Sequence, residues 1–225
     1  SRVDINNSRV ISNSSTYAVR AINGELLMSD SLIAGNGDDL NDYGLYVDAN
    51  ATSQVSLTRT IIHSNTGYGL FSRDNAVLLA KAITVTNNGN GAVRTDAKNV
   101  PDLLGGGNTF TNNTPNRLTI EPGTIDQPVT LGTDQGLTSY GLLNQVVVGG
   151  GTVLTVAPGM TIYGEEANAR LLVLGHLHAP GSYTRPITFT SVTDIGPYEW
   201  GGIMFDDAGG QGSGRQTNPF GKITR

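Results

Sequence analysis

The 225-residue chain is mildly acidic, with 14 Lys and Arg against 19 Asp and Glu and a formal net charge of -5. This balance provides no basic surface for nucleic acid, and no run of about 18 apolar residues is present to insert into a bilayer. The absence of cysteine excludes disulfides, thiolate metal sites and a cysteine nucleophile. Thirty glycines and nine prolines favour many short strands joined by turns.

A pattern of two apolar residues separated by one residue recurs in the first half of the chain. Because side chains alternate across a strand, both members of each pair should point to the same side. The pairs are Val3-Ile5, Leu26-Met28, Val55-Leu57 and Val77-Leu79. Ten residues after the start of each pair lies an asparagine, and a degenerate fifth copy, GGGNTFTNN at 105–113, adds one more: Asn13, Asn36, Asn65, Asn87 and Asn112.

Two further columns keep this register. Five residues after the start of each pair lie the small residues Ser8, Ser31, Thr60 and Ala82. After each asparagine comes another apolar segment, led by Val19, Leu45, Leu70 and Val93. Each repeat therefore holds three short strands and three bends, and one unit of 22 to 29 residues cannot bury its apolar face alone.

We therefore predict an all-β fold, a single-stranded right-handed parallel β-helix of about nine coils with three short strands per coil. The solenoid should run continuously over 1–225, with asparagine-ladder coils over 1–117 and less regular coils over 118–225. Equivalent residues of successive coils would lie about 4.8 Å apart, so that asparagines at one bend could hydrogen-bond to one another. We predict a structural role for this ladder, because it satisfies buried polar groups at the bend.

The second half continues the pattern less regularly. The segments LTVAPGMTIYG, LLVLGHLHAPGS, RPITFTS and WGGIMFDDAGG alternate apolar residues, and two of them break at Pro-Gly turns. This succession, strongest over 140–206, resembles the bacterial extracellular right-handed parallel β-helix repeat proteins, the non-catalytic surface-protein branch of the pectate-lyase-like superfamily. That superfamily includes polysaccharide lyases and hydrolases, adhesins and phage tail spikes, so the resemblance implies the fold and leaves the activity open.

The candidate surface-loop ligand or cation site is the acidic segment GNGDDLNDYG, with Asp38, Asp39 and Asp42. It lies in the longest coil, whose extra residues predict a lateral loop; such loops often carry function, although polar loops are also commonly only solvated. Galacturonan hydrolases with a similar Asp-Asp pair also carry Gly-His-Gly and Arg-Ile-Lys segments, and this chain has neither. We therefore assign no catalytic residue.

A second acidic group comprises Asp48, Asp74 next to Arg73, and Asp96 two residues after Arg94. Stacked carboxylates could bind Ca²⁺ through oxygen ligands. They could equally form neutralising pairs with the neighbouring arginines. No other cofactor is indicated, and His176 and His178, which alternate along one predicted strand, lack an identifiable third metal ligand.

Both ends of the predicted solenoid lack an evident cap. The segment SRVDINN begins a strand within two residues, and GKITR at 221–225 places Ile223 in a strand-like setting. Written end before beginning, GKITRSRVDINNSRVISN has the pattern of an uninterrupted coil. The chain starts without Met and without the features of a signal peptide, and we expect it to be a piece of a longer or processed polypeptide.

These observations favour a structural, extracellular or cell-surface solenoid. We expect one unit of a rod or filament, formed by tandem repetition or by head-to-tail stacking of the chain with itself through open edges. Surface glycans are a further expected partner, whereas nucleic acid and membrane insertion are not expected. The alternatives are a polysaccharide-degrading lyase or hydrolase and a glycan-binding adhesin module. Asn50-Ala51-Thr52 is an N-glycosylation acceptor sequence.

Overall fold

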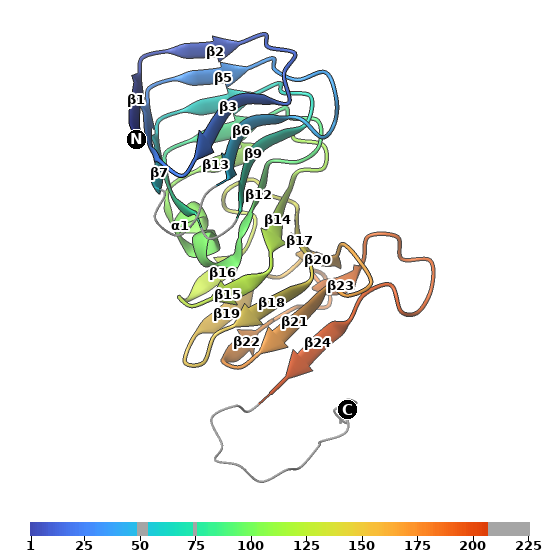
Figure 1. The fold of residues 1–225 in the computed structure, drawn as a ribbon. Coiled ribbons are helices and arrows are strands. Elements are labelled where there is room, and N and C mark those ends of the chain that lie inside the picture. The colour runs from blue at the N-terminus through green and yellow to red at the C-terminus, as the bar shows by residue number, and fades with distance from the viewer. Residues whose placement is uncertain (49–53, 74–75, 207–225) are drawn as a thin grey trace.

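The computed structural model describes residues 1–48, 54–73 and 76–206, which form a parallel β-solenoid of about seven turns (Figure 1). The predicted all-β, parallel β-helix class is confirmed. Five sheets run along the stack, and each strand pairs with the equivalent strand of the neighbouring coil. Each coil holds three strands joined by sharp bends, and each of the three strands belongs to a different sheet.

Sheets A and B hold the first two strands of each early coil. Sheet A has the order β1-β4-β7-β10, with β1 at Arg2–Asn6, β4 at Glu25–Ser29, β7 at Gln54–Thr58 and β10 at Val77–Lys81. Sheet B has the order β13-β11-β8-β5-β2, with β2 at Arg9–Ile11, β5 at Leu32–Ala34, β8 at Ile61–His63, β11 at Thr84–Thr86 and β13 at Thr109–Thr111.

Sheet C runs through the whole stack and gives the molecule its continuity. Its eight strands have the order β23-β20-β17-β14-β12-β9-β6-β3. Their bounds are Tyr17–Ile22 (β3), Tyr43–Asp48 (β6), Tyr68–Arg73 (β9), Val93–Asp96 (β12), Arg117–Glu121 (β14), Ser139–Leu142 (β17), Thr161–Gly164 (β20) and Thr188–Ser191 (β23).

Sheets D and E complete the later coils. Sheet D has the order β15-β18-β21-β24, with β15 at Gly123–Ile125, β18 at Gln145–Val148, β21 at Arg170–Val173 and β24 at Gly202–Phe205. Sheet E has the order β16-β19-β22, with β16 at Val129–Leu131, β19 at Val153–Val156 and β22 at His176–His178.

A short helical segment separates the two halves. The 3₁₀ helix η1 (Ala97–Asn99) and helix α1 (Val100–Gly105) follow β12, at the place in the coil where earlier coils have a strand of sheet A. Pro101 lies in the first turn of α1, where the backbone N–H groups have no partner within the helix, so the lack of an N–H in proline costs nothing there. Sheet A therefore stops at β10 and sheet D begins at β15, and Figure 1 shows the two halves of the stack offset beside α1.

The expectation of about nine coils was too high. Residues 97–108 contribute helix and turn where a strand was expected, and the loops over 179–187 and 192–201 use chain without adding a rung. Residues 207–225, including the predicted strand residue Ile223, lie outside the described part of the chain. The eight strands of sheet C correspond to about seven turns from first to last.

The core is a series of aligned apolar columns. Val3, Leu26, Val55 and Leu78 occupy one column, and all but the first are at most 4% exposed. The predicted alignment of Val77-Leu79 with this column is wrong by one residue, because Leu78 and Ala80 point inward. The run Val77-Leu78-Leu79-Ala80 is apolar at both parities, so alternation could not fix its register.

An asparagine ladder runs along the bend between sheets B and C. Its members are Asn13, Asn36, Asn65, Asn88 and Asn113. From Asn36 onward, each Oδ1 accepts the side-chain Nδ2–H of the asparagine in the preceding coil at 2.9 Å, and also its backbone N–H at 3.0 to 3.2 Å. The ladder ends on Asn116, whose Oδ1 accepts from Asn113 and whose Nδ2 donates to two backbone carbonyls.

The predicted ladder members Asn87 and Asn112 are one residue too early. They have φ of 56° and 57°, are exposed, and align with Ser12, Gly35 and Ser64, whose left-handed backbone makes the bend. Asparagine tolerates this conformation better than other non-glycine residues, which explains the pairs Asn87-Asn88 and Asn112-Asn113. The same slip corrects the small-residue column, because Ile83, and not Ala82, aligns with Thr60.

Replacing Asn88 by Ala should lower the free energy of unfolding by about 2 to 4 kcal/mol, because the N–H and Nδ2–H of Asn65 would lose their buried acceptor. Replacing the adjacent Asn87 by Gly, which keeps the left-handed bend, should change it by less than about 0.5 kcal/mol. Urea unfolding of both variants measures the difference. Equal losses in the two variants would contradict the observed register.

Candidate functional site: the outer face of sheet C

The acidic loop around residue 40 uses its carboxylates to hold its own shape. Asp42 is buried, and its Oδ2 accepts the backbone N–H of Asp38 at 2.8 Å and of Asp39 at 2.9 Å. Asp39 in turn accepts the backbone and side-chain N–H groups of Asn41, both at 2.8 Å. Within the described residues no group of three or more His, Asp or Glu is placed to hold a metal ion. The carboxylates of Asp42 and Asp39 therefore brace the loop, and Asp38 takes part through its backbone N–H.

The second acidic group pairs with arginines. Asp48 accepts a hydrogen bond from Arg20 at 2.9 Å and lies 3.5 Å from the Nε of Arg73. Hydrogen bonding to Arg20, helped by the charge of Arg73, holds the pKa of Asp48 below its ordinary value. Of the two options that the sequence left open for this carboxylate, the structure shows the neutralising pair. Asp74 and the acceptor residue Asn50 lie outside the described residues.

Among the residues that the structure describes, no further ligand group converges on the two histidines of β22. His176 and His178 are exposed on the outer face of sheet E, while Leu177 between them points to the core. This is the arrangement that strand alternation predicts.

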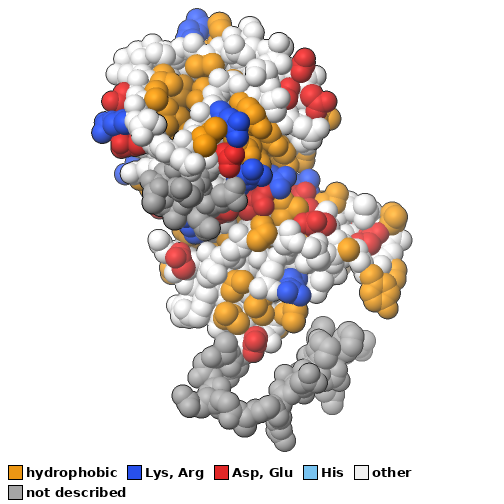
Figure 2. Space-filling model, viewed as in Figure 1, with side chains coloured by type: hydrophobic (Ala, Val, Ile, Leu, Met, Phe, Trp, Pro, Cys, Tyr) orange, Lys and Arg blue, Asp and Glu red, His pale blue; other side chains and the backbone are white. Residues whose placement is uncertain are grey.

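A feature that sequence reasoning missed lies on the outer face of sheet C. Arginine, carboxylate and aromatic side chains follow one another there from coil to coil, and we call them the arginine–aromatic strip. Its members are Tyr17, Arg20, Tyr43, Tyr46, Asp48, Tyr68, Phe71, Arg73, Arg94, Arg117, Thr119, Glu121, Tyr163 and Glu165. Figure 2 shows blue, red and orange side chains gathered across the middle of the molecule, over the region where Figure 1 places β9, β12 and β14.

Stacked rings form the early part of the strip. The ring centroids of Tyr17 and Tyr43 are 5.8 Å apart, those of Tyr43 and Tyr68 are 6.1 Å apart, and both pairs are nearly parallel. Tyr46 and Phe71 are buried beside them and meet edge to face. Burial raises the pKa of Tyr43 and of Tyr46, so both hydroxyls are neutral across the physiological range. The signal in the sequence was the repeated YGLY and YGLF at the starts of β6 and β9.

Arginines lie over these rings. The guanidinium carbon of Arg20 is 4.8 Å from the ring centroid of Tyr17, and that of Arg94 is 4.7 Å from the centroid of Phe71. Such contacts combine cation–π attraction with burial of the arginine stem. The rings therefore hold the guanidinium groups in an ordered row.

The carboxylate side chains of the strip are less exposed to solvent than most of its arginine side chains. The side chains of Asp48, Glu121 and Glu165 are 15% to 22% exposed, whereas those of Arg20 and Arg73 are 40% and 46% exposed. Arg94 pairs with Glu121 in the same way. Within the early part of the strip, the most exposed charged groups are therefore guanidinium donors.

Glu165 joins three coils at the middle of sheet C. It crosses Gly141, where a Cβ atom would collide with its carboxylate. Its Oε1 accepts from Thr119 at 2.9 Å and lies 3.3 Å from the buried Nε of Arg117, without hydrogen-bond geometry. The guanidinium of Arg117 also lies 5.2 Å from the ring centroid of Tyr163. Glycine at 141 is therefore what lets this charged cluster lie flat on the sheet.

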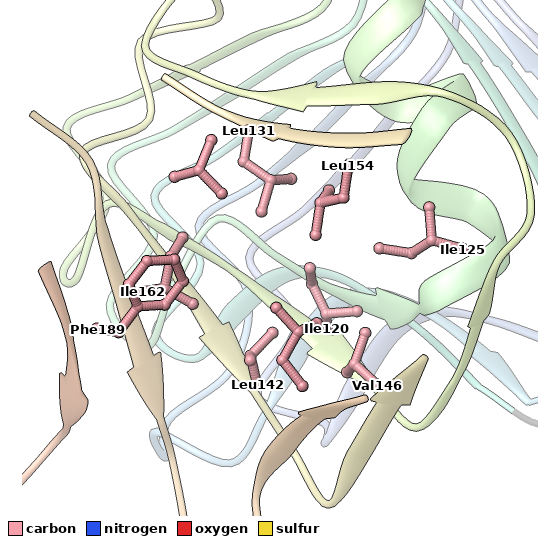
Figure 3. Close-up of a pocket in the computed structure, with 10 residues that line it drawn as sticks. Ile120, Ile125, Leu131, Leu142, Val146, Leu154, Ile162 and Phe189 are labelled. Carbon is pink, nitrogen blue, oxygen red and sulfur yellow. The ribbon is translucent and has the colours of Figure 1, made fainter. Parts of the chain in front are cut away.

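The enclosed space inside the second half is part of the core. Aliphatic side chains and Phe189 line it from several strands, and none of the lining residues carries a charge (Figure 3). Its volume is only about 10 Å³. A space of this size without polar partners does not hold a water molecule, so it is a packing gap and not a ligand site.

No family model, curated protein or solved structure matches this chain. Among the described residues, no helix has the combination of length and apolarity that crossing a bilayer requires.

The pairing of Asp48 predicts a pH-dependent contribution to stability. Because its pKa is lowered, the contribution is present above the ordinary carboxyl pKa of about 4 and is lost as the pH falls through the lowered pKa. At pH 7, Asp48→Asn should lower the free energy of unfolding by about 1 kcal/mol, and the difference from wild type should vanish near pH 2.

Urea unfolding at the two pH values tests this. The matched control is Asp4→Asn, whose ion pair with Arg2 is more than half exposed on both sides, and we expect no measurable change for it. A loss in Asp48→Asn that persists unchanged at pH 2 would exclude the ion pair as its cause.

Proposed function

We propose that this protein is a non-catalytic structural solenoid, a segment of a longer extracellular or cell-surface rod. The protein is stabilised mainly by contacts between consecutive coils, because the core columns, the asparagine ladder and the sheets all repeat along one axis. The resemblance of 140–206 to the surface-protein branch of the pectate-lyase-like superfamily supports the extracellular assignment. Further coils are added either by tandem repetition or by stacking of separate chains.

The observation that carries this proposal is the uncovered first rung. Strands β1, β2 and β3 lie at the edges of their sheets. Val3 is 52% exposed, whereas its equivalent one coil further, Leu26, is 4% exposed. Together with Ile5, Val19 and Ala21, Val3 lines an open hollow of about 170 Å³. Side chains that are inward-facing yet uncovered favour the addition of another coil.

Electron microscopy of the native particle, combined with the mass of the intact native polypeptide, tests the rod. We expect elongated particles longer than the stack of about seven turns. A compact, capped particle of 23.6 kDa would refute the proposal.

A second candidate function is glycan binding by the arginine–aromatic strip. The observation that favours it is the set of outward guanidinium donors over ordered rings, carried by Arg20 on β3, Arg73 on β9 and Arg94 on β12 of sheet C. Guanidinium groups offer forked hydrogen bonds, and ring edges offer apolar contact, to an extended polysaccharide. This function would reside on the same rod and needs no catalytic residue.

Retention on immobilised polysaccharides tests the strip. If it binds glycans, Arg73→Ala should weaken retention about tenfold, the effect of losing one charge-assisted hydrogen bond. The matched control is Arg59→Ala, which removes an even more exposed arginine that pairs with Asp30 away from sheet C. Equal retention of both variants would exclude the strip as the binding surface.

A further inference from the structure

Strand β16 has one edge that no other described strand covers. Sheet E has the order β16-β19-β22, so β16 pairs with β19 on one side only. The strand at the equivalent place in the coil before it is β13, and these two do not pair with each other in the described part of the chain. Helix α1 packs against β16 instead, and Figure 1 shows the two side by side. The uncovered edge therefore lies in the middle of the stack.

The main-chain groups on this edge have a known direction. The backbone N–H of Ala157 donates to the carbonyl of Leu131 at 2.9 Å, so Leu131 and Val129 are the residues that bond to β19. The residue between them directs its N–H and C=O to the other side of the strand. Thr130 therefore presents a donor and an acceptor on the uncovered edge, and Pro128 presents a carbonyl there. Among the described residues, no backbone group outside the sheet bonds to Thr130.

An open hollow of about 200 Å³ lies along the same edge. Pro101 and Leu104 of α1 give it apolar walls on the side facing β16. Gly105 leaves it unobstructed, because a Cβ atom at that position would meet no atom within 4 Å. Asp134 supplies the single charge of the lining. The hollow is smaller than the roughly 300 to 1,000 Å³ of small-molecule sites, and its size suits a side chain of a peptide.

We infer that β16 is a docking edge for an extended peptide segment of a partner protein, which adds to sheet E as one more parallel strand. The segment places an apolar side chain in the hollow and a lysine or arginine near Asp134, whose charge it complements. It can form three main-chain hydrogen bonds, two with Thr130 and one with the carbonyl of Pro128. In strand addition of this kind the main chain provides affinity and the hollow provides specificity.

The length of the edge limits the strength of this contact. Strand β16 has three residues, and Pro128 before it has no N–H to extend the pairing. A contact of this length buries less than the roughly 1,200 Å² at which stable interfaces begin, so binding should be weak and reversible. The docking edge lies on the side of the solenoid, and the inference does not depend on the rod.

An NMR titration of the isotopically labelled 225-residue chain with a synthetic peptide tests the inference. The probe is the acetylated and amidated peptide Thr-Val-Leu-Thr-Val-Lys, which copies 152–156, including the strand that already pairs with β16, and ends in lysine. We expect saturable shifts confined to the amides of β16, the bend after it and the end of α1. Exchange of the Thr130 amide hydrogen should slow at least about tenfold at saturation.

Two variants of the chain should each raise the dissociation constant of the peptide at least about tenfold. Gly105→Phe fills the hollow, and Asp134→Lys reverses its charge. The matched controls are Gly196→Phe, at a glycine outside the hollow that also has no atom within 4 Å of its Cβ position, and Asp4→Lys on β1. Both controls should bind like wild type, and circular dichroism establishes that every variant is folded.

A second peptide tests the main-chain hydrogen bonds. With proline in place of its second valine, the peptide lacks the N–H that would donate to the carbonyl of Thr130, and it should not bind. The inference is overturned by the absence of saturable shifts at millimolar peptide or by shifts confined to other surfaces. Equal affinity of the two peptides, or equal affinity of wild type and Gly105→Phe, would also overturn it.

Discussion

The hydrogen bond between asparagines of consecutive coils is the constraint on which this structure depends. At the bend between sheets B and C the backbone turns through a residue in the left-handed conformation. The backbone polar groups at this bend no longer take part in the hydrogen bonds between strands, so they need other partners. One asparagine side chain per coil supplies both the missing acceptor and the missing donors. The hydrogen bond from Nδ2 of one asparagine to Oδ1 of the next is 2.9 Å long. Each coil is therefore completed by its neighbour, which makes the stack cooperative and leaves its first member incomplete.

The helix α1 shows how the stack changes its cross-section without losing continuity. It ends sheet A and precedes sheet D, while sheet C passes beside it unbroken. The ladder stops in the same region, at Asn116. Later coils rely instead on aliphatic packing around the small gap in Figure 3 and on Glu165, which ties three rungs of sheet C together. The early and late coils are thus held together by different contacts, although sheet C runs through both.

The arginine–aromatic strip and the uncovered rung are surfaces of different kinds. The strip is ordered by its own rings and carboxylates, and a ligand there would meet groups already fixed in place. The uncovered rung is made of inward-facing apolar side chains, among them the exposed Val3, of the kind that later coils bury. A rod could therefore use its ends for length and its side for contact with a polymer.

The sequence by itself determined the parallel β-solenoid, the repeat of three strands and the positions of Asn13, Asn36 and Asn65, because alternation and a recurring bend residue are local properties. Only the tertiary structure decided between Asn87 and Asn88 and between Val77 and Leu78, since both choices are locally equivalent and the neighbouring coil selects one register. It also decided that Asp39 and Asp42 brace the loop that contains Asp38, and that residues from six strands of sheet C form a strip. Those outcomes depend on pairs of residues far apart in sequence, whose contacts no local pattern specifies.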